Sequence, residues 1–169
     1  MPKTLADART RLTILITQPA TFATPKLTEL NHASAIDASC RLLKSDFRLS
    51  PTASDTIADT ELCSEGNATA FGASNYEGSV TPFWYLDATG KSAALEDLVY
   101  QAMKVKGTRL WFVMREGPKY DAAWAVGDVV EVYEVITDHP QKPSDRAGYI
   151  KRVIPLGVQR AEINAVTIA

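Results

Sequence analysis

The amino-acid sequence predicts a mainly β (α+β) fold, an antiparallel β-sandwich or barrel with one flanking α-helix and a long extended loop. Three observations support it: several strand-length runs are rich in β-branched and aromatic residues, only one segment has helical spacing, and no regular helices connect the strands. The chain has 169 residues, 46% hydrophobic and 22% charged. That balance is ordinary for a single domain spanning residues 1–169.

The first part of the chain contains three candidate elements. Leu12–Thr17 has the composition of a strand and is bounded by Pro19. Leu27–Asn31 suits a helical turn, and Ala35–Leu43 is a candidate second strand in which the apolar residues alternate poorly. We therefore expect this region to begin the sheet but to contribute few long elements to it.

The middle of the chain predicts one strand and one helix. Tyr76–Asp87 is rich in aromatic and β-forming residues, and Pro82 lacks a backbone donor, which places this strand at an edge or bulges it there. A helix is predicted over residues 93–105, with Ser92 as its N-cap and Gly107 as its stop signal. The apolar stripe of this helix consists of Leu95, Leu98, Val99, Ala102 and Met103.

The last third of the chain is dominated by strands. Thr108–Arg115 is almost continuously apolar and is expected to be central in the sheet. Val129–Thr137 and Tyr149–Pro155 are two further predicted strands, and Val158–Ile168 forms a last strand or a tail.

The segment Lys44–Asn75, which we call the arm, lacks a core of its own. Its large apolar residues are scattered, and it carries two basic and five acidic residues, a net charge of −3 in a chain whose total is −2. A long irregular segment in a small domain is usually functional or disordered. We expect an arm that becomes ordered only against another protein.

The totals exclude several classes of protein. A net charge of −2 and a pI near 5.7 argue against a surface that neutralises nucleic-acid phosphates. No apolar run is long enough for a membrane span, and the N-terminal sequence is too weak for a signal peptide. Cys40 and Cys63 make no disulfide framework; a single bridge between them stays open, but the missing secretion signal favours free thiols.

Gly90-Lys91-Ser92 lies between a predicted strand and the predicted helix, where a phosphate-binding loop places its lysine and hydroxyl. That motif also needs a glycine five residues before Gly90, and this position is Tyr85. A turn, a solvated lysine and a helix cap account for all three residues, so we predict no nucleotide site here.

The remaining chemical candidates are weak. His139, Ser144 and Asp145 have triad residue types, but they lie close together on one loop without a rigid frame, which favours a solvated loop. No metal-ligand spacing or dinucleotide fingerprint is present. Of the tryptophans, Trp84 and Trp111 lie in apolar strands and are expected in the core, whereas Trp124 is a candidate for an interface. The sequence thus predicts no catalytic, cofactor or metal site, and no enzyme.

The order and spacing of several segments resemble the major tail tube proteins of long-tailed (siphovirus-type) bacteriophages, most closely those of phages that infect actinobacteria. The resemblance covers most of the chain, without a catalytic signature. The segments that carry it are Leu30–Leu43, Cys63–Asp87, Lys106–Thr108, Val126–Val129, Ile136–Pro140 and Gly148–Pro155.

This resemblance implies a structural virion protein, assembled in the host cytoplasm into hexameric rings that stack into a tube for DNA ejection. It implies that the arm reaches the next ring, and that a tape measure protein and a tail terminator are partners. Double-stranded DNA is then a non-specific passenger, which suits a mildly acidic wall. The chain ends, Met1–Arg11 and Gly157–Ala169, are further candidate contacts between subunits.

The predicted interface residues are those of the arm together with its flanking strand and Trp124. They are Arg48, Leu49, Ile57, Leu62, Phe71, Tyr76 and Trp124. Two other interpretations stay open. One is a different ring-forming virion component, such as a tail terminator or head–tail connector, and the other is a small-ligand or flavin-binding β-barrel enzyme.

Overall fold

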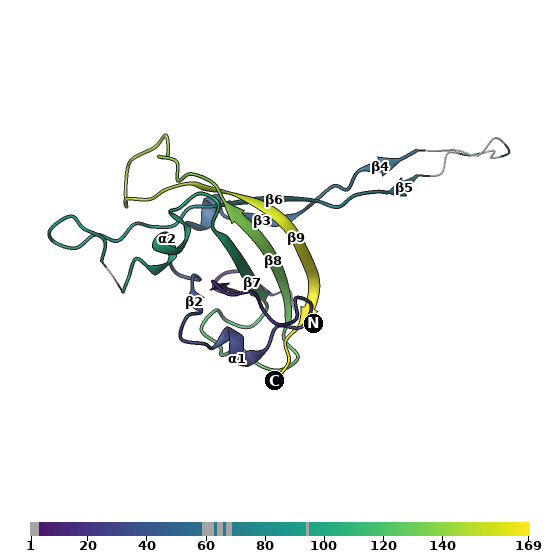
Figure 1. The fold of residues 1–169 in the computed structure, drawn as a ribbon, viewed down its shortest axis with the longest axis horizontal. Coiled ribbons are helices and arrows are strands. Elements are labelled where there is room, and N and C mark those ends of the chain that lie inside the picture. The colour runs from purple at the N-terminus through teal and green to yellow at the C-terminus, as the bar shows by residue number, and fades with distance from the viewer. Residues whose placement is uncertain (1–3, 59–62, 64–65, 67–68, 94) are drawn as a thin grey trace.

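A computed structural model describes residues 4–58, 63, 66, 69–93 and 95–169 of the chain. It contains a seven-stranded sheet in the order β2-β1-β7-β8-β9-β6-β3, with antiparallel pairing throughout, and a two-stranded sheet, β4-β5. The larger sheet is strongly curved, and the two short helices lie beside it (Figure 1). The predicted mainly β, antiparallel fold class is confirmed.

The centre of the sheet is formed by β7 (Arg109–Glu116) and β8 (Val129–Thr137). These bounds match the predicted strands at 108–115 and 129–137 closely. Six residue pairs join them, from Arg109↔Ile136 to Met114↔Glu131. All side chains of β7 between its two terminal residues are buried, because both faces of the strand are covered. A strand covered on both faces reads as a continuous apolar run, which is why the sequence identified it.

Each face of the sheet has its own apolar cluster. Leu110, Phe112 and Met114 point to one face, where α2 (Leu98–Met103), β3 (Arg48–Thr52) and β6 (Asn75–Val80) cover them. Trp111 and Val113 point to the other face, which is covered by α1 (Leu27–Leu30) and the loop that carries Trp124. The sheet therefore curls over, so that its own strands β6 and β3 help to cover one face while α1 and the Trp124 loop cover the other.

The last strand differs from the prediction. Instead of a strand at 149–155 followed by a second strand or tail, β9 is one strand of 13 residues, Ile154–Val166. Residues 157–166 of the predicted terminal arm therefore lie within the sheet. The strand pairs with β8 through two register shifts, and Asn164, near one of them, has φ +68°. A bulge absorbs an extra residue, and Asn tolerates this backbone conformation better than most residues.

The predicted helix over 93–105 is shorter in the structure, where α2 starts after Asp97. Ser92 is not its cap, since the Ser92 hydroxyl accepts hydrogen bonds from Trp84 Nε1 (3.0 Å) and Gln101 Nε2 (2.8 Å). Of the predicted stripe, Val99 and Met103 are buried, whereas Leu95 and Leu98 are exposed. The prediction of a buried stripe was therefore wrong at Leu95 and Leu98. The helical turn at 27–31 is confirmed as α1.

The early strands are shifted or shortened. The strand predicted at 12–17 is β1 (Thr10–Leu15), and the strand predicted at 35–43 is reduced to β2 (Ile36–Asp37). The chain then turns, which explains the poor alternation of its apolar residues. The strand predicted at 76–87 is β6, which ends at Val80, just before Pro82.

Candidate assembly surfaces

The arm is a β-hairpin ladder that leaves the body of the protein. At its base β3 and β6 form five residue pairs, from Arg48↔Ser79 to Thr52↔Asn75. The same two chain segments continue outward as β4 (Thr56–Ile57) and β5 (Ala70–Phe71), which pair with each other. The resulting hairpin projects far from the sheet (Figure 1). The expectation of an irregular segment was wrong for this described part of the arm.

Hydrogen bonds around Asp55 bridge the step between the two ladders. The Asp55 amide donates to Ala73 O (3.0 Å), and the Gly72 amide donates to Asp55 O (2.7 Å). The Asn75 side chain donates to Asp55 Oδ1 (2.9 Å) and to Ala53 O (3.1 Å). Backbone hydrogen bonds and this Asp–Asn pair thus connect the two ladders of the hairpin.

Two large apolar side chains of the hairpin are exposed. Phe71 is 80% exposed and Ile57 is 49% exposed. Thr56 lies opposite Phe71 and Ile57 lies opposite Ala70, so the two apolar side chains point to opposite faces of the hairpin. Exposed apolar residues on both faces of a projecting hairpin are suited to contacts with other subunits.

The base of the hairpin belongs to the body. Leu49 is only 3% exposed and packs in the same cluster as Phe112, and the half-buried Tyr76 packs against that cluster. Arg48 Nη1 lies 3.9 Å from Glu77 Oε2 across the ladder, and both side chains are largely exposed. Leu49 therefore offers little surface to another subunit. Leu62, also predicted at an interface, lies outside the described residues.

Trp124, another predicted interface residue, is only 5% exposed. Its ring lies between the guanidinium groups of Arg11 and Arg115, 5.1 and 4.9 Å from the ring centroid, and its Nε1 donates to Thr13 Oγ1 (3.2 Å). Arg115 is itself buried and binds Asp128 Oδ2 at 2.6 Å. This cluster holds the loop after β7 against the sheet, so Trp124 contributes to the internal packing of the chain.

A basic loop was missed by sequence reasoning. Residues 141–153 contain four basic residues, Lys142, Arg146, Lys151 and Arg152, and one acidic residue, Asp145. A bridge between Gln141 and Val153 closes the base of this loop, which we call the basic loop. None of the four cations forms an ion pair with a described residue. The density of these four basic residues within a short stretch of sequence is the signal that could have identified the loop.

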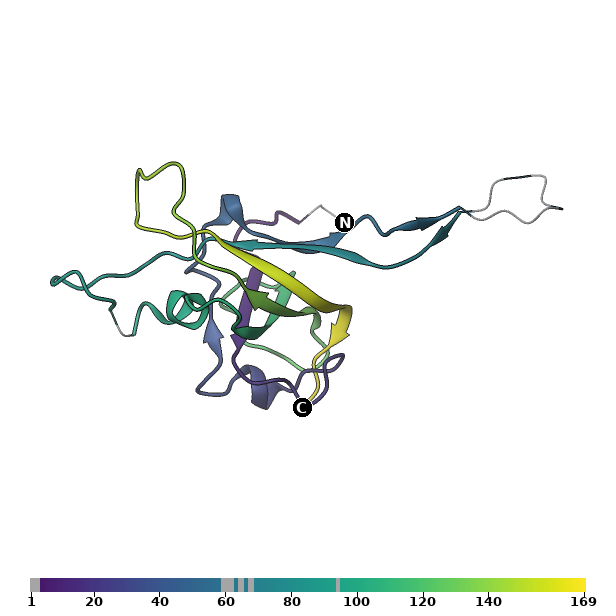
Figure 2. The ribbon, with the colours of Figure 1, turned by 45° about the horizontal axis from the view of Figure 1, so that its top comes forward.

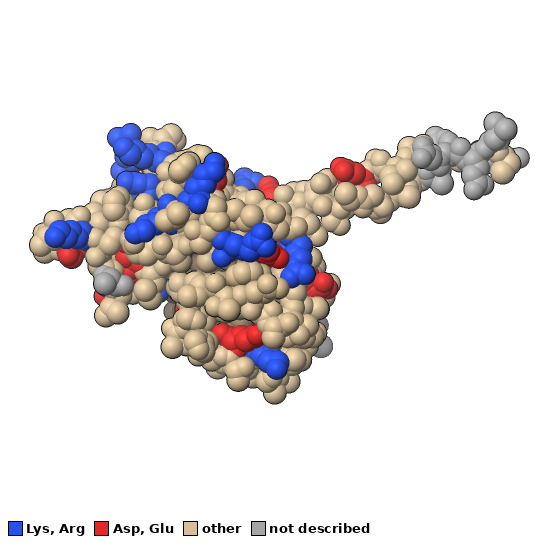
Figure 3. Space-filling model, in the orientation of Figure 1, with Lys and Arg blue, Asp and Glu red and all other residues tan. Residues whose placement is uncertain are grey.

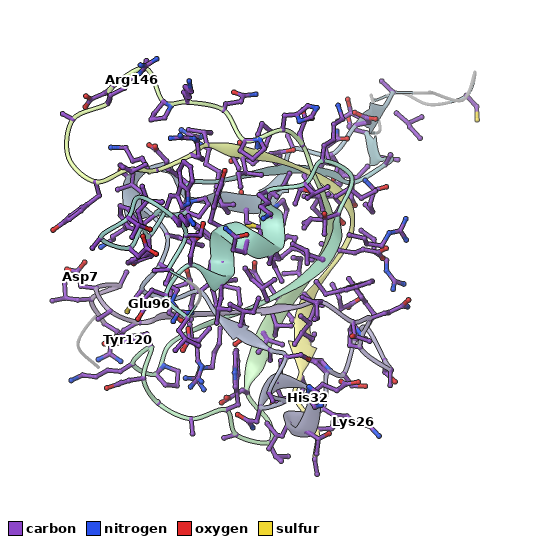
Figure 4. The ribbon with its side chains drawn as sticks, turned by 60° about the vertical axis from the view of Figure 1, so that its left-hand side comes forward. Asp7, Lys26, His32, Glu96, Tyr120 and Arg146 are labelled. Atoms are coloured by element: carbon purple, nitrogen blue, oxygen red, sulfur yellow. The ribbon has the colours of Figure 1, made fainter. Side chains whose placement is uncertain are left out.

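Figure 3 shows Lys and Arg gathered at the end of the molecule that carries the basic loop, away from the hairpin. The side chain of Arg146 lies at the outer rim of the loop (Figure 4). Tyr149 and Ile150, on the same loop, are 81% and 49% exposed. The Tyr149 ring packs edge-on against the Phe83 ring, with the two ring centroids 5.9 Å apart. The basic loop therefore combines positive charge with exposed apolar surface.

In the Gly90-Lys91-Ser92 turn, the amides of Gly90 and Lys91 both donate hydrogen bonds to Asp87. Asp87 Oδ1 accepts hydrogen bonds from the amides of Thr89 (2.8 Å) and Lys91 (3.0 Å) and from the Thr89 hydroxyl (2.7 Å). These bonds, that of the Thr89 hydroxyl first, lower the pKa of Asp87 below its ordinary value. A carboxylate of the protein itself thus occupies the position that an anion would need.

The other chemical candidates are not assembled into a site. His139, Ser144 and Asp145 are all exposed, and within the described chain no hydrogen bond joins their side chains. Nor do the described residues include three or more His, Cys, Asp or Glu placed to hold a metal ion. Among the helices described, none is long and apolar enough to cross a membrane.

The large sheet has open edges. β3 and β2 are its outermost strands, and Pro51 in β3 is of the kind tolerated at an edge. On the side that faces β9, β6 pairs with only two residues of that strand, Ile154 and Pro155. Within the described residues, β9 has no strand partner from 157 to 165 along the edge that faces away from β8. Unpaired strand edges are templates for pairing with another chain.

Comparison with known proteins identifies the family. No curated protein matches the sequence. A family model described as "Phage tail tube protein" matches residues 1–169, the whole of the chain. This agrees with the resemblance seen in the sequence and with a domain that offers projecting and open-edged surfaces. The chain therefore belongs to the phage tail tube protein family and has a structural role in the tail of the virion.

Proposed function

We propose that this chain assembles into closed rings, hexameric as in the tail tubes it resembles, and that the rings stack into the tube through which phage DNA is ejected. The family match over the whole chain is the observation that carries this proposal. Closed rings need a head-to-tail contact whose rotation closes, and stacking needs a second contact that repeats along the axis.

The open edge of β9 supports the contact around the ring. A long unpaired edge is a liability in a monomer, because it pairs with any available strand. In a ring, an edge strand of the neighbouring copy pairs with it, and the sheets of the copies join into one continuous wall around the lumen. The net charge of −2 fits a wall past which DNA moves without being retained.

The hairpin supports the contact between rings. It projects beyond the body and carries its exposed apolar residues, Ile57 and Phe71, away from the core (Figure 1). In this proposal the tape measure protein occupies the lumen during assembly, and a tail terminator closes the tube. Assembly takes place in the cytoplasm of the host, and the host is an actinobacterium as in the phages that the sequence resembles.

Electron microscopy of concentrated, negatively stained protein tests the proposal. Long tubes with a regular axial repeat are the expected result. Single closed rings indicate instead a connector or terminator, and stable monomers with a bound chromophore indicate a flavin-type barrel enzyme; either result contradicts the proposal.

A hairpin deletion tests the axial contact. Replacement of residues 54–73 by two glycines spares the pairing of β3 with β6. The expected product is a folded subunit with an unchanged unfolding midpoint that forms no tubes. Tubes of normal length from this variant contradict the assignment of the hairpin to the contact between rings.

A further inference from the structure

The hairpin and the basic loop extend from opposite ends of the molecule. In Figure 1 the hairpin leaves the body on the right, and the basic loop lies on the upper left. Figure 2, turned by 45°, shows the same separation. Two features at opposite ends cannot meet within one chain, but a head-to-tail arrangement of copies can bring them together.

The two features have opposite charge. The basic loop carries a net charge of +3. The sequence from residue 53 to residue 75 contains four acidic and no basic residues, a net charge of −4. Of the four, the structure describes Asp55, which is exposed on the hairpin. A segment with only acidic charges is thus matched by a loop whose cations form no ion pair with a described residue.

Both features also expose apolar side chains. Phe71 and Ile57 on the hairpin have counterparts in Tyr149 and Ile150 on the basic loop. Exposed ion pairs contribute little to affinity individually, so charge alone makes a weak contact. Burial of an aromatic ring and an aliphatic side chain on each side adds affinity, while the charges set orientation and association rate.

We propose that the basic loop of one copy is the docking site for the β4–β5 hairpin of the next copy. The proposal rests on the proposed function, because it names the surface that completes the contact between rings. Phe71 packs beside Tyr149 and Ile150, and Lys142 and Arg146 face the acidic hairpin.

Two other occupants or sites compete with this proposal. DNA phosphates also bind cations, but a phosphate contact would not bury the adjoining exposed side chains of Tyr149 and Ile150. A second surface feature, a groove of about 260 Å³ lined in part by Leu12, Leu42 and Phe47, is apolar enough to receive the hairpin. Its one lysine, Lys44, is already bonded to Asp7 at 2.6 Å, so the groove lacks spare positive charge.

Cross-linking from the hairpin locates its docking site. A photoreactive benzophenone side chain replaces Phe71, and assembled tubes made from mixed light and ¹⁵N-labelled protein are irradiated and digested. The expected products are mixed-isotope peptides that join position 71 to residues 141–153 of another copy. Cross-links to the groove around Phe47, or to any other surface, overturn the proposal while the tubes themselves still support the proposed function.

Charge reversal tests the electrostatic part. The double variant Lys142→Glu, Arg146→Glu is compared with Lys26→Glu, Lys119→Glu, which changes the net charge equally at exposed lysines that form no ion pair with a described residue. Lys26 lies at the opposite end of the view in Figure 4 from Arg146. In about 150 mM salt the loop variant is expected to need at least about ten times more protein to form tubes, a change of about 1.4 kcal/mol. The control variant is expected to assemble as the original protein does.

The outcomes separate the two proposals. Equal assembly of both double variants overturns the docking site and leaves the tube intact. Failure of the unaltered protein to form tubes contradicts the proposed function, and this inference with it. Binding of a 20-base-pair DNA duplex that is lost in the loop variant, measured by fluorescence anisotropy, assigns the loop to DNA and also overturns the docking site.

Discussion

The β7–β8 pair and the β4–β5 pair are both antiparallel ladders, but they are stabilised in different ways. Six residue pairs join β7 to β8, and apolar side chains from both faces of the sheet cover them. Two residue pairs join β4 to β5, and every residue of these two strands is exposed. Backbone pairing alone is a marginal source of stability, whereas apolar burial is the dominant one.

This difference distinguishes the part of the molecule that is packed within one chain from the part whose apolar residues stay exposed. The body has two apolar clusters buried within the chain, one on each face of the sheet. The hairpin keeps its apolar residues in water, so their burial is available to an assembly contact. Two matched substitutions, one in the body and one in the hairpin, test whether the two regions are stabilised differently. A third substitution, at the joint between them, tests how closely β6 approaches β9.

Phe112→Ala has the largest expected effect on the free energy of unfolding. Phe112 is completely buried between β1 and β8, in the cluster that includes Leu49. Truncation of a buried phenylalanine leaves a cavity and costs about 3–5 kcal/mol. Urea denaturation, at a protein concentration too low for assembly, measures the change. A loss below about 1 kcal/mol shows that the body is not packed as described.

The same contrast explains what the sequence could predict. β7 and β8 were found because burial on one or both faces selects apolar residues at regular positions. The hairpin was not found as a hairpin, because no core selects an alternating pattern in strands that bury nothing. The acidity of the arm and its few core residues were nevertheless visible in the sequence, although Leu49, inside the arm as predicted, is buried in the body.

Other misses came from tertiary contacts. Ser92 does not cap α2, because its hydroxyl accepts hydrogen bonds from Trp84 and Gln101, contacts that local propensity does not predict. Trp124 is buried because Arg11, more than a hundred positions earlier in the chain, stacks on its ring. An exposed-looking Ala-Ala-Trp-Ala stretch gives no hint of that partner. The basic loop, by contrast, could have been identified from the sequence by its four basic residues.

Gly78→Ala, at the joint between body and hairpin, has an intermediate expected effect. A Cβ at Gly78 lies 2.9 Å from Leu156 Cβ and from Leu156 O, so β6 must move away from β9. Such overpacking costs about 1–3 kcal/mol. Gly157→Ala is the matched control, since its Cβ meets no atom closer than 3.6 Å and an effect of about 0.5 kcal/mol or less is expected. Equal losses in the two variants, again from urea denaturation, contradict the close approach of β6 to β9.

Phe71→Ala has the smallest expected effect on unfolding. The truncation is chemically the same as Phe112→Ala, but the Phe71 ring is 80% exposed. Substitutions at such positions usually change the free energy of unfolding by no more than about 0.5 kcal/mol. In the proposed tube the Phe71 side chain is buried against a neighbouring copy. Its loss is therefore expected to weaken assembly and not the folding of the subunit. The critical protein concentration for tube formation, followed by light scattering, is expected to rise, while the unassembled subunit unfolds at an unchanged urea midpoint. A variant that unfolds more easily yet assembles normally reverses both expectations, and it shows that Phe71 stabilises its own subunit instead of the next one.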